Sequence, residues 1–453
     1  MDRFGRSLTG RKPTFRRAET GNSYRMLLWM FLILAMLWIL LQLNQPNGAV
    51  QPLFLPTPTA TRTAGSFILE AQAYAQAGRI DDPGSDNDAL GAYQRAIASE
   101  PGNIQARTEL ARLLTYSSAL LPTTEQRRAR LEDARRYIQE AAQLAPDDSN
   151  VHAVYAFVLD WSASPTLYGS EKAQELLLNA EQEASRALLL DPNNPLALTF
   201  YAEILVDLQK WTEAQNQIEQ AVRAAPDLMD AYRVYGYVLE AQRAYSAAIE
   251  QYTKASQIAP NMTFLYLSIG LNYRTLALKA TSDAVAKELY GQALENFDRA
   301  AKINEALGVI DPLPYLHIAK TYSQMGDFFA AARNAEKALR FDPTDANTYG
   351  QLGIIYVKSR NYEGALPVLK CAVLGCTAEE NKESTDQAIA IQPLPLSSIE
   401  VAFYYLQYGS VLAALAQCEQ AVPVLEMVNQ AYPNDELLQS IIQEDYAICG
   451  LQR

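Results

Sequence analysis

The sequence predicts an all-α protein in which one long apolar helix near the N-terminus precedes a solenoid of paired helices. Two observations predict this fold class. Pro192, Pro226 and Pro260 recur at intervals of 34 residues, each after a helix-like run, and an apolar stretch with Gln42 as its only strongly polar member occupies residues 26–43. A sequence period of about 20 to 50 residues is typical of repeat architectures in which each unit is one supersecondary motif.

The first 43 residues divide into a basic arm, 1–25, and a predicted transmembrane helix, 26–43. At 1.5 Å per residue the helix spans roughly 27 Å of hydrocarbon. Seven basic and two acidic residues precede it, and no basic residue follows it before Arg62. This positive-inside bias predicts a single-pass protein of the cell membrane with a cytoplasmic N-terminus. A cleaved signal peptide has the same charge order, but the length of the stretch and the poor cleavage site after it favour an anchor.

Residues 44–65 form a Pro/Thr-rich segment that contains the run Pro56-Thr57-Pro58-Thr59. Such a composition has little apolar surface to bury. We expect a semi-extended stalk between the membrane helix and the repeats.

The repeats, predicted over residues 66–450, follow a pattern of large and small apolar positions that ends in proline. Before Pro226 the pattern reads Leu198, Tyr201, Ala202, Leu205, Ala214, Ile218 and Ala221. The first four positions have the spacing of one helix face and the last three that of another, so each repeat is a pair of antiparallel helices. The small residues stand where the two helices cross closely.

The same register predicts nine repeats and a C-terminal cap helix from Glu436 to Cys449. Insertions of 11 and 12 residues are expected between the paired helices, near 117–128 and 163–173. Pro367 and Pro423 lie inside second helices. Either these helices start late, so that proline falls in the first turn, or they kink.

This pattern resembles the tetratricopeptide repeat family, as a membrane-anchored member. The resemblance implies a right-handed α-solenoid of about nine helix hairpins plus the cap helix. It also implies a concave groove lined by the first helix of each repeat. The pairing of Lys at the fifth with Asn at the ninth repeat position, by which chaperone-binding relatives hold a C-terminal carboxylate, occurs in no repeat here.

The groove positions implied by the resemblance carry a set of aromatic, aliphatic and charged side chains that predicts a partner-binding site for an extended or helical peptide. These candidate site residues are Arg112, Tyr116, Phe157, Trp161, Arg233, Tyr237, Glu240, Phe264, Leu267, Leu271 and Arg274. One alternative stays open. Phe157 and Trp161 could instead pack under the insertion that follows them.

Composition argues against catalysis and against nucleic-acid binding. The net charge is −13, and because the first 25 residues carry +5, residues 26–453 carry −18 and repel phosphate backbones. No catalytic or nucleotide-binding motif appears, and both histidines, His152 and His317, stand at packing positions. We therefore expect no enzyme activity, no cofactor and no metal site.

Four cysteines, Cys371, Cys376, Cys418 and Cys449, lie in the last two repeats and the cap. They lack the paired spacing of a zinc site. Cys418 and Cys449 stand at the same rim of adjacent elements in the repeat register, which predicts one disulfide, and Cys371 with Cys376 is a second candidate. The alternative is four buried thiols that act as small hydrophobes.

The sequence thus predicts a membrane-anchored scaffold that binds a partner protein or peptide outside the cytoplasmic membrane. A second hypothesis is a non-catalytic subunit that presents substrate to a cell-envelope assembly enzyme. The sequence does not identify the partner.

Overall fold

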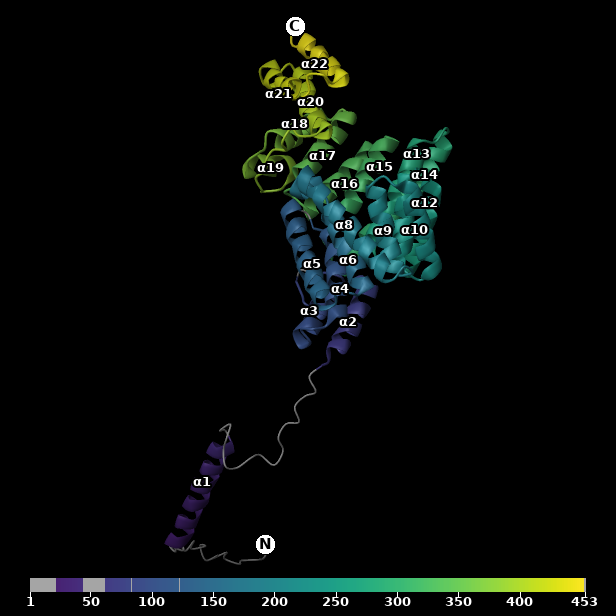
Figure 1. Ribbon diagram of the computed structural model, residues 1–453. Helices are drawn as coiled ribbons and strands as arrows, with labels where there is room; N and C mark the ends of the chain where they lie inside the picture. The colour runs from purple at the N-terminus through teal and green to yellow at the C-terminus, as the bar shows by residue number, and fades with distance from the viewer. Residues whose placement is uncertain (1–21, 44–61, 83, 122, 452–453) are drawn as a thin grey trace, which may run out of the picture. The chain divides into compact units, whose positions relative to one another are not determined.

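The computed structural model describes residues 22–82, 84–121 and 123–451, except 44–61. The chain divides into two compact units, Met1–Thr61 and Arg62–Arg453. The basic arm and most of the predicted stalk lie outside the described residues. Within the described residues there are 22 helices and no strand, which confirms the all-α fold class (Figure 1).

Helix α1 (Ser23–Leu43) begins three residues before the predicted span. Of the described helices, only this one is long and apolar enough to cross a membrane, by length and composition. Its large apolar side chains are exposed on all sides, with Trp29 65 % and Phe31 69 % exposed. A helix that is apolar around its whole circumference needs an apolar surrounding.

The second unit consists, within the described residues, of nine helix hairpins and a final helix, in the predicted order (Figure 1). The first helices are α2 (Ala64–Gln76), α4 (Ile104–Ser118), α6 (Ser149–Ser162), α9 (Pro195–Asp207), α11 (Met229–Ala241), α13 (Thr263–Leu278), α15 (Leu313–Met325), α17 (Ala346–Lys358) and α20 (Ile399–Ala414). The second helices are α3 (Ala89–Ser99), α5 (Thr124–Leu144), α8 (Ser170–Leu190), α10 (Trp211–Ala224), α12 (Tyr245–Ile258), α14 (Asp283–Leu307), α16 (Phe328–Phe341), α18 (Tyr362–Val373) and α21 (Cys418–Ala431). Helix α22 (Glu436–Ile448) is the cap.

The proline that ends a repeat also prepares the start of the next one. In five repeats the residue two positions after it accepts a backbone N–H from the first turn of the following helix: Asn103, Asp148, Asn194, Asp345 and Asp435. After Pro226 and Pro260 this position holds Leu228 and Met262, which make no such cap. Such a cap satisfies N–H groups that have no partner inside the helix. Where it occurs, the Pro-x-Asx sequence therefore ends the second helix of one repeat and caps the first helix of the next.

The insertions mostly lengthen second helices. Helices α5 and α8 have 21 residues each and α14 has 25, against 14 in α10 and α12. The short helices α7 (Pro165–Tyr168) and α19 (Ala378–Thr385) are additional. Pro367 and Pro423 lie in the second turn of α18 and α21, so the idea that these helices start late is wrong. The predicted stalk also ends too late, because Ala64 and Gly65 belong to α2.

Small residues mark the crossing of paired helices, as predicted. A Cβ atom added to Gly270 would lie 2.4 Å from the Phe297 ring, and one added to Gly236 would lie 2.8 Å from the Tyr252 ring. Phe297 is fully buried. In these two hairpins a large side chain of the second helix thus occupies space left by a glycine of the first.

We expect Gly270→Ala to lower the free energy of unfolding by about 1 to 3 kcal/mol, because the methyl group forces Phe297 from its site. Gly291→Ala is the matched control in the same repeat. No atom lies within 4 Å of a Cβ at that position of α14, so alanine should raise stability by up to about 1 kcal/mol through helix propensity. Denaturant titration followed by circular dichroism measures both. If both variants changed the free energy of unfolding equally, α13 and α14 would not cross closely at Gly270.

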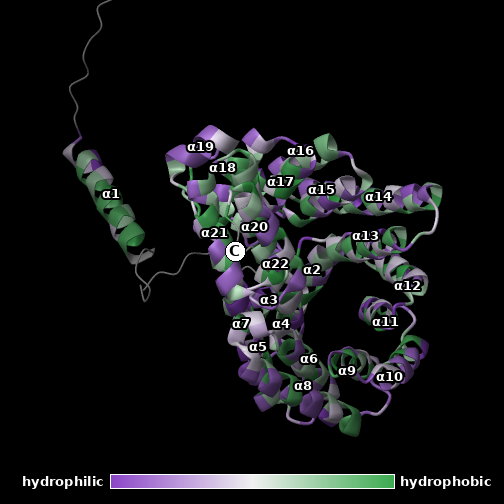
Figure 2. Ribbon diagram, turned by 90° about the horizontal axis from the view of Figure 1, so that it is seen from above, coloured by the Kyte–Doolittle hydropathy of each residue, from purple (hydrophilic) through white to green (hydrophobic). Residues whose placement is uncertain are grey.

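The first six hairpins curve so far that the start of the array meets its middle. Figure 2 shows their first helices on the inner side of the curve and their second helices on the outer side. The Asn261 side chain donates a hydrogen bond to the carbonyl of Gln76 at 3.2 Å, across 185 residues. A Cβ added to Gly78 would also meet Leu307 at 3.0 Å. The concave face of this part of the solenoid is therefore narrow.

Two disulfides occur in the C-terminal repeats, and they have the predicted pairing. Cys418, the first residue of α21, is bonded to Cys449 after α22, with a Cα–Cα distance of 5.6 Å. Cys371 is bonded to Cys376, next to an isolated β-bridge between Cys376 and Ile391. The first bridge attaches the cap to the last hairpin, where a terminal helix would otherwise fray.

Thiol titration of denatured, unreduced protein is expected to find no reactive thiol, and four after reduction, because all four cysteines are paired. Cys418→Ser should release one thiol, that of Cys449. Four reactive thiols without reductant would reject both disulfides. Two reactive thiols would mean that only one disulfide is present.

Candidate binding groove

The structure gathers the candidate groove residues but buries several of them. Tyr116, Phe157, Arg233, Leu267 and Arg274 are at most 8 % exposed, whereas the sequence analysis expected open side chains. The other six are half-buried: Arg112, Trp161, Tyr237, Glu240, Phe264 and Leu271. For Tyr116 and Arg233 the difference arises because the concave face is narrow enough for residues of opposite walls to meet. Phe157 and Arg274 are buried against neighbouring helices instead.

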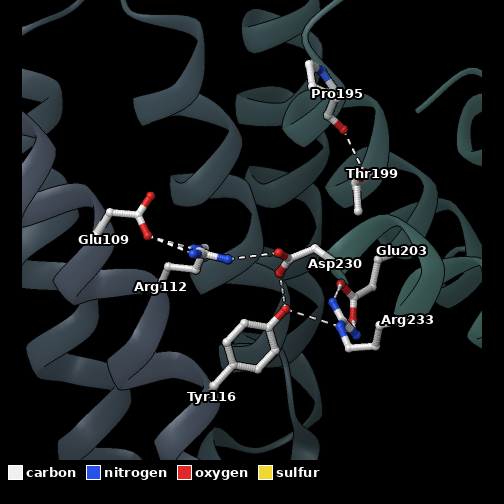
Figure 3. Close-up of polar contacts among 8 residues, drawn as sticks. All are labelled: Glu109, Arg112, Tyr116, Pro195, Thr199, Glu203, Asp230 and Arg233. Atoms are coloured by element: carbon white, nitrogen blue, oxygen red, sulfur yellow. Dashed lines mark hydrogen bonds and ion pairs between the residues drawn. The ribbon is translucent and has the colours of Figure 1, made fainter. Parts of the chain in front are cut away.

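A chain of charged and polar contacts crosses the groove between α4 and α11 (Figure 3). Arg112 of α4 contacts Glu109 at 2.7 Å and Asp230 of α11 at 2.8 Å. Tyr116 donates a hydrogen bond to Asp230. Arg233 binds both oxygens of Glu203, at 2.7 and 2.6 Å, and donates to the Tyr116 hydroxyl at 3.1 Å. Such two-pronged, charge-assisted contacts are among the strong polar interactions of a protein interior.

Aromatic rings surround this polar chain. Tyr116 stacks on Phe264 with centroids 5.5 Å apart, and it contacts Phe157 and Trp161 at 5.1 and 5.5 Å. The Arg233 guanidinium carbon lies 5.4 to 5.9 Å from the ring centroids of Tyr116, Phe157 and Trp161. Phe157 also stacks on Phe200. These rings and Arg233 form a packed cluster, and Phe157 is part of the core.

The alternative for Phe157 and Trp161 holds only in that Phe157 is packed, because its partners are not residues of the insertion. Phe157 is packed, but against Phe200 and Tyr116 of the two neighbouring first helices, with Arg233 of the opposite wall over its ring. Trp161 stays half-buried and donates its indole N–H to Glu203 at 3.1 Å. Two further candidates have local partners. Glu240 accepts hydrogen bonds from Tyr252 and Asn272, and Arg274 donates to the carbonyl of His317.

Beside the cluster the concave face keeps a pocket of about 370 Å³. Its aromatic lining includes Trp161, Tyr237, Tyr252 and Phe264. Its charged lining is Asp160, Glu203, Asp207 and Arg233. This volume is within the range of about 300 to 1,000 Å³ that is typical of ligand pockets.

Asp160 and Asp207 form an acidic pair in this pocket. Asp160 is 6 % exposed and its Oδ1 atom has no hydrogen-bond partner in the structure. Asp207 is solvent-accessible and accepts a hydrogen bond from Tyr237 at 2.6 Å. Burial raises the pKa of Asp160 well above its usual range, and the neighbouring Asp207 and Glu203 raise it further. Although Asp207 as a whole is solvent-accessible, desolvation of its carboxyl within the pocket, together with the charge of Glu203, raises its pKa as well.

Sequence reasoning missed two residues that organise the groove, Asp160 and Asp230. In the repeat register they stand at the twelfth and second positions, which the family resemblance assigns to the concave face. Their repeat positions therefore indicated a place on the concave face, but the candidate residues were chosen mainly for their aromatic side chains. Within the part of the chain that the structure describes, no group of His, Cys, Asp and Glu is arranged to hold a metal ion.

Comparisons with known proteins agree with the fold. Residues 201–263 and 314–345 match the tetratricopeptide repeat family. The human IFIT1 dimer with PPP-AAAA is similar at 15 % identity and a TM-score of 0.51, over 86 % of this chain and 97 % of that chain. A tetratricopeptide repeat protein from Parabacteroides merdae is 16 % identical over 64 % of this chain and 98 % of its own, with a TM-score of 0.40.

With nine helix hairpins in the described chain and two matched segments, the protein is a tetratricopeptide repeat protein. Proteins of this fold serve as protein-interaction scaffolds, with function carried by the surface of the solenoid. The similarity to the IFIT1 structure, at 15 % identity, concerns the fold alone.

Proposed function

We propose that this protein is a membrane-anchored scaffold, with its repeats outside the cytoplasmic membrane, that binds a partner protein or peptide on its concave face. The observation that carries the binding proposal is the pocket of about 370 Å³ beside the cross-groove cluster. Trp161, Tyr237 and Phe264 remain half-buried there, and aromatic side chains in a partly desolvated pocket are typical anchors of a protein interface.

Three features support the location. Helix α1 is long and apolar enough to span a bilayer, and seven basic residues precede residue 26. The two disulfides of the C-terminal repeats suit an oxidising compartment, since such bonds are rare in the cytosol.

Charge favours a protein over a nucleic acid as the partner. Residues 26–453 carry a net charge of −18, and the pocket is lined by three carboxylates and one guanidinium. A phosphate backbone would be repelled from this surface.

The topology has a direct test. A reporter that is active only outside the cytoplasm, fused after Arg453, is expected to be active. The matched control is the same reporter fused after Arg25, before the membrane helix, which should be inactive. Activity of a cytoplasmic reporter at Arg453 would overturn the proposed location.

Partner binding can be tested by a photo-reactive amino acid in place of Leu271 on the concave side of α13. The control position is Leu189 on α8, which is 84 % exposed. In intact membranes, Leu271 should give a discrete cross-linked protein that Leu189 does not give. Identical products from both positions, or none from Leu271, would contradict binding in the groove.

A further inference from the structure

Resting on the proposed function, we propose that the pocket beside the cross-groove cluster takes one cationic group, the guanidinium or ammonium of a basic side chain of the partner. The class of ligand follows from the charges, the rings and the unpaired oxygen in the pocket.

The charges in the pocket do not balance. Glu203 is fully engaged by Arg233, which binds both of its oxygens. The carboxyls of Asp160 and Asp207 are within hydrogen-bonding reach of each other. Among the described residues neither has a basic ion-pair partner, because the nearby Arg233 pairs with Glu203. Two carboxyls so close cannot both ionise without a compensating charge. They must hold a proton or receive a cation.

The buried oxygen points to a ligand. Asp160 lines the pocket and is only 6 % exposed. Its Oδ1 atom has no hydrogen-bond partner. A buried acceptor without a donor is unfavourable, and a ligand donor that reaches this carboxyl would satisfy it. A guanidinium or ammonium group supplies donors together with the missing positive charge.

The aromatic lining suits the same ligand. Trp161, Tyr237, Tyr252 and Phe264 line the pocket, and aromatic rings attract cations. The protein already contains an example of this recognition, because Arg233 lies against the rings of Tyr116 and Trp161 while it binds Glu203. Asp160, Asp207 and Tyr237 line the same pocket and offer carboxyls beside a ring, without a guanidinium of their own.

The test is calorimetric titration of the full chain in detergent at low ionic strength. The probes are Nα-acetyl-arginine methylamide, its neutral isostere Nα-acetyl-citrulline methylamide, and agmatine. We expect the arginine probe to bind at least 10-fold more tightly than the citrulline probe. Agmatine separates the two sources of the cation. Binding of the arginine probe at least as tight as that of agmatine supports a side chain, whereas agmatine binding more than 10-fold tighter indicates a free amine and overturns the partner assignment.

Variants connect the binding to the acidic pair. Asp160→Asn and Asp207→Asn should each weaken binding of the arginine probe at least 10-fold. Asp227→Asn, the same change at an exposed residue in the loop before α11, should leave it unchanged. Asp160→Asn should not lower the melting temperature, because it removes a buried carboxyl that lacks a full set of partners. Asp207 is solvent-accessible, so its variant carries little risk of misfolding.

Equal binding of arginine and citrulline probes, unchanged binding in both variants, or binding of Ca²⁺ that depends on Asp160 would overturn the proposal. So would the absence of any binding at millimolar probe concentration. These outcomes are independent of the cross-linking at Leu271. A cross-linked partner without cation binding would leave the scaffold function standing and remove only this pocket from it.

Discussion

Replacing Arg233 with methionine is expected to lower the free energy of unfolding by about 3 to 5 kcal/mol, because it breaks a buried ion pair from one side only. Glu203 is 5 % exposed and would keep its charge with no cationic partner. Tyr116 would lose the guanidinium that donates to its hydroxyl and lies over its ring. Denaturant titration of the full chain measures the loss.

The matched control is Arg223→Met on α10. Arg223 is an exposed arginine whose contact with Glu219 is 3.9 Å long. Surface pairs of this kind contribute about 0 to 1 kcal/mol, so the control should be nearly neutral. The double variant Arg233→Met with Glu203→Leu should recover at least half of the loss, since no buried charge is left unpaired. A cost of Arg233→Met no larger than that of the control would show that the groove is open in solution.

The fold was predictable because its determinants are local. A glycine in one helix and an aromatic residue in the next, such as Gly236 and Tyr252, stand 16 residues apart and meet within one hairpin. The proline and the apolar spacing recur from unit to unit. A misplaced boundary in one predicted repeat therefore does not shift the boundaries predicted for the next. The disulfide between Cys418 and Cys449 followed from the same register, because it joins adjacent elements.

The closure of the groove was not predictable in this way. Arg112 and Asp230 meet across 118 residues. Their contact depends on the curvature summed over four hairpins, and curvature follows from small rotations between neighbours that the repeat pattern does not encode. The repeat register therefore predicted which residues lie on the concave face, but not which of them contact one another. Contacts across the groove bury Arg233, whereas Tyr237 on the same helix stays half-buried.

The residues that sequence reasoning overlooked are polar ones at positions of ordinary appearance. Asp160 follows an apolar run on α6, and an isolated aspartate on a solenoid helix usually faces solvent. Only the structure shows that it is buried beside Asp207 with an oxygen left unpaired. A scan for acidic residues at concave positions of consecutive repeats would have paired Asp160 with Asp207.

The second large effect expected is at Phe157. Phe157→Ala should cost about 3 to 5 kcal/mol, because it leaves a cavity in a packed core. The ring is completely buried, stacks on Phe200 with centroids 4.4 Å apart, and contacts Tyr116 of the neighbouring helix α4. The control is Phe329→Ala on α16, where the ring is 75 % exposed and its removal should change stability by less than about 0.5 kcal/mol.

The comparison of Phe157 with Leu271 decides how the groove is divided between packing and binding. If Phe157 is core, its loss should lower the melting temperature strongly, while Leu271→Ala weakens the affinity for a cross-linked partner by about 1 to 3 kcal/mol with helix content unchanged. The opposite result, in which Phe157→Ala keeps its stability and loses the partner, would mean that the rings of Phe157 and Tyr116 separate to admit it. Binding would then have to disrupt the contacts of Arg233 as well, and Arg233→Met, although less stable, would bind the partner more tightly.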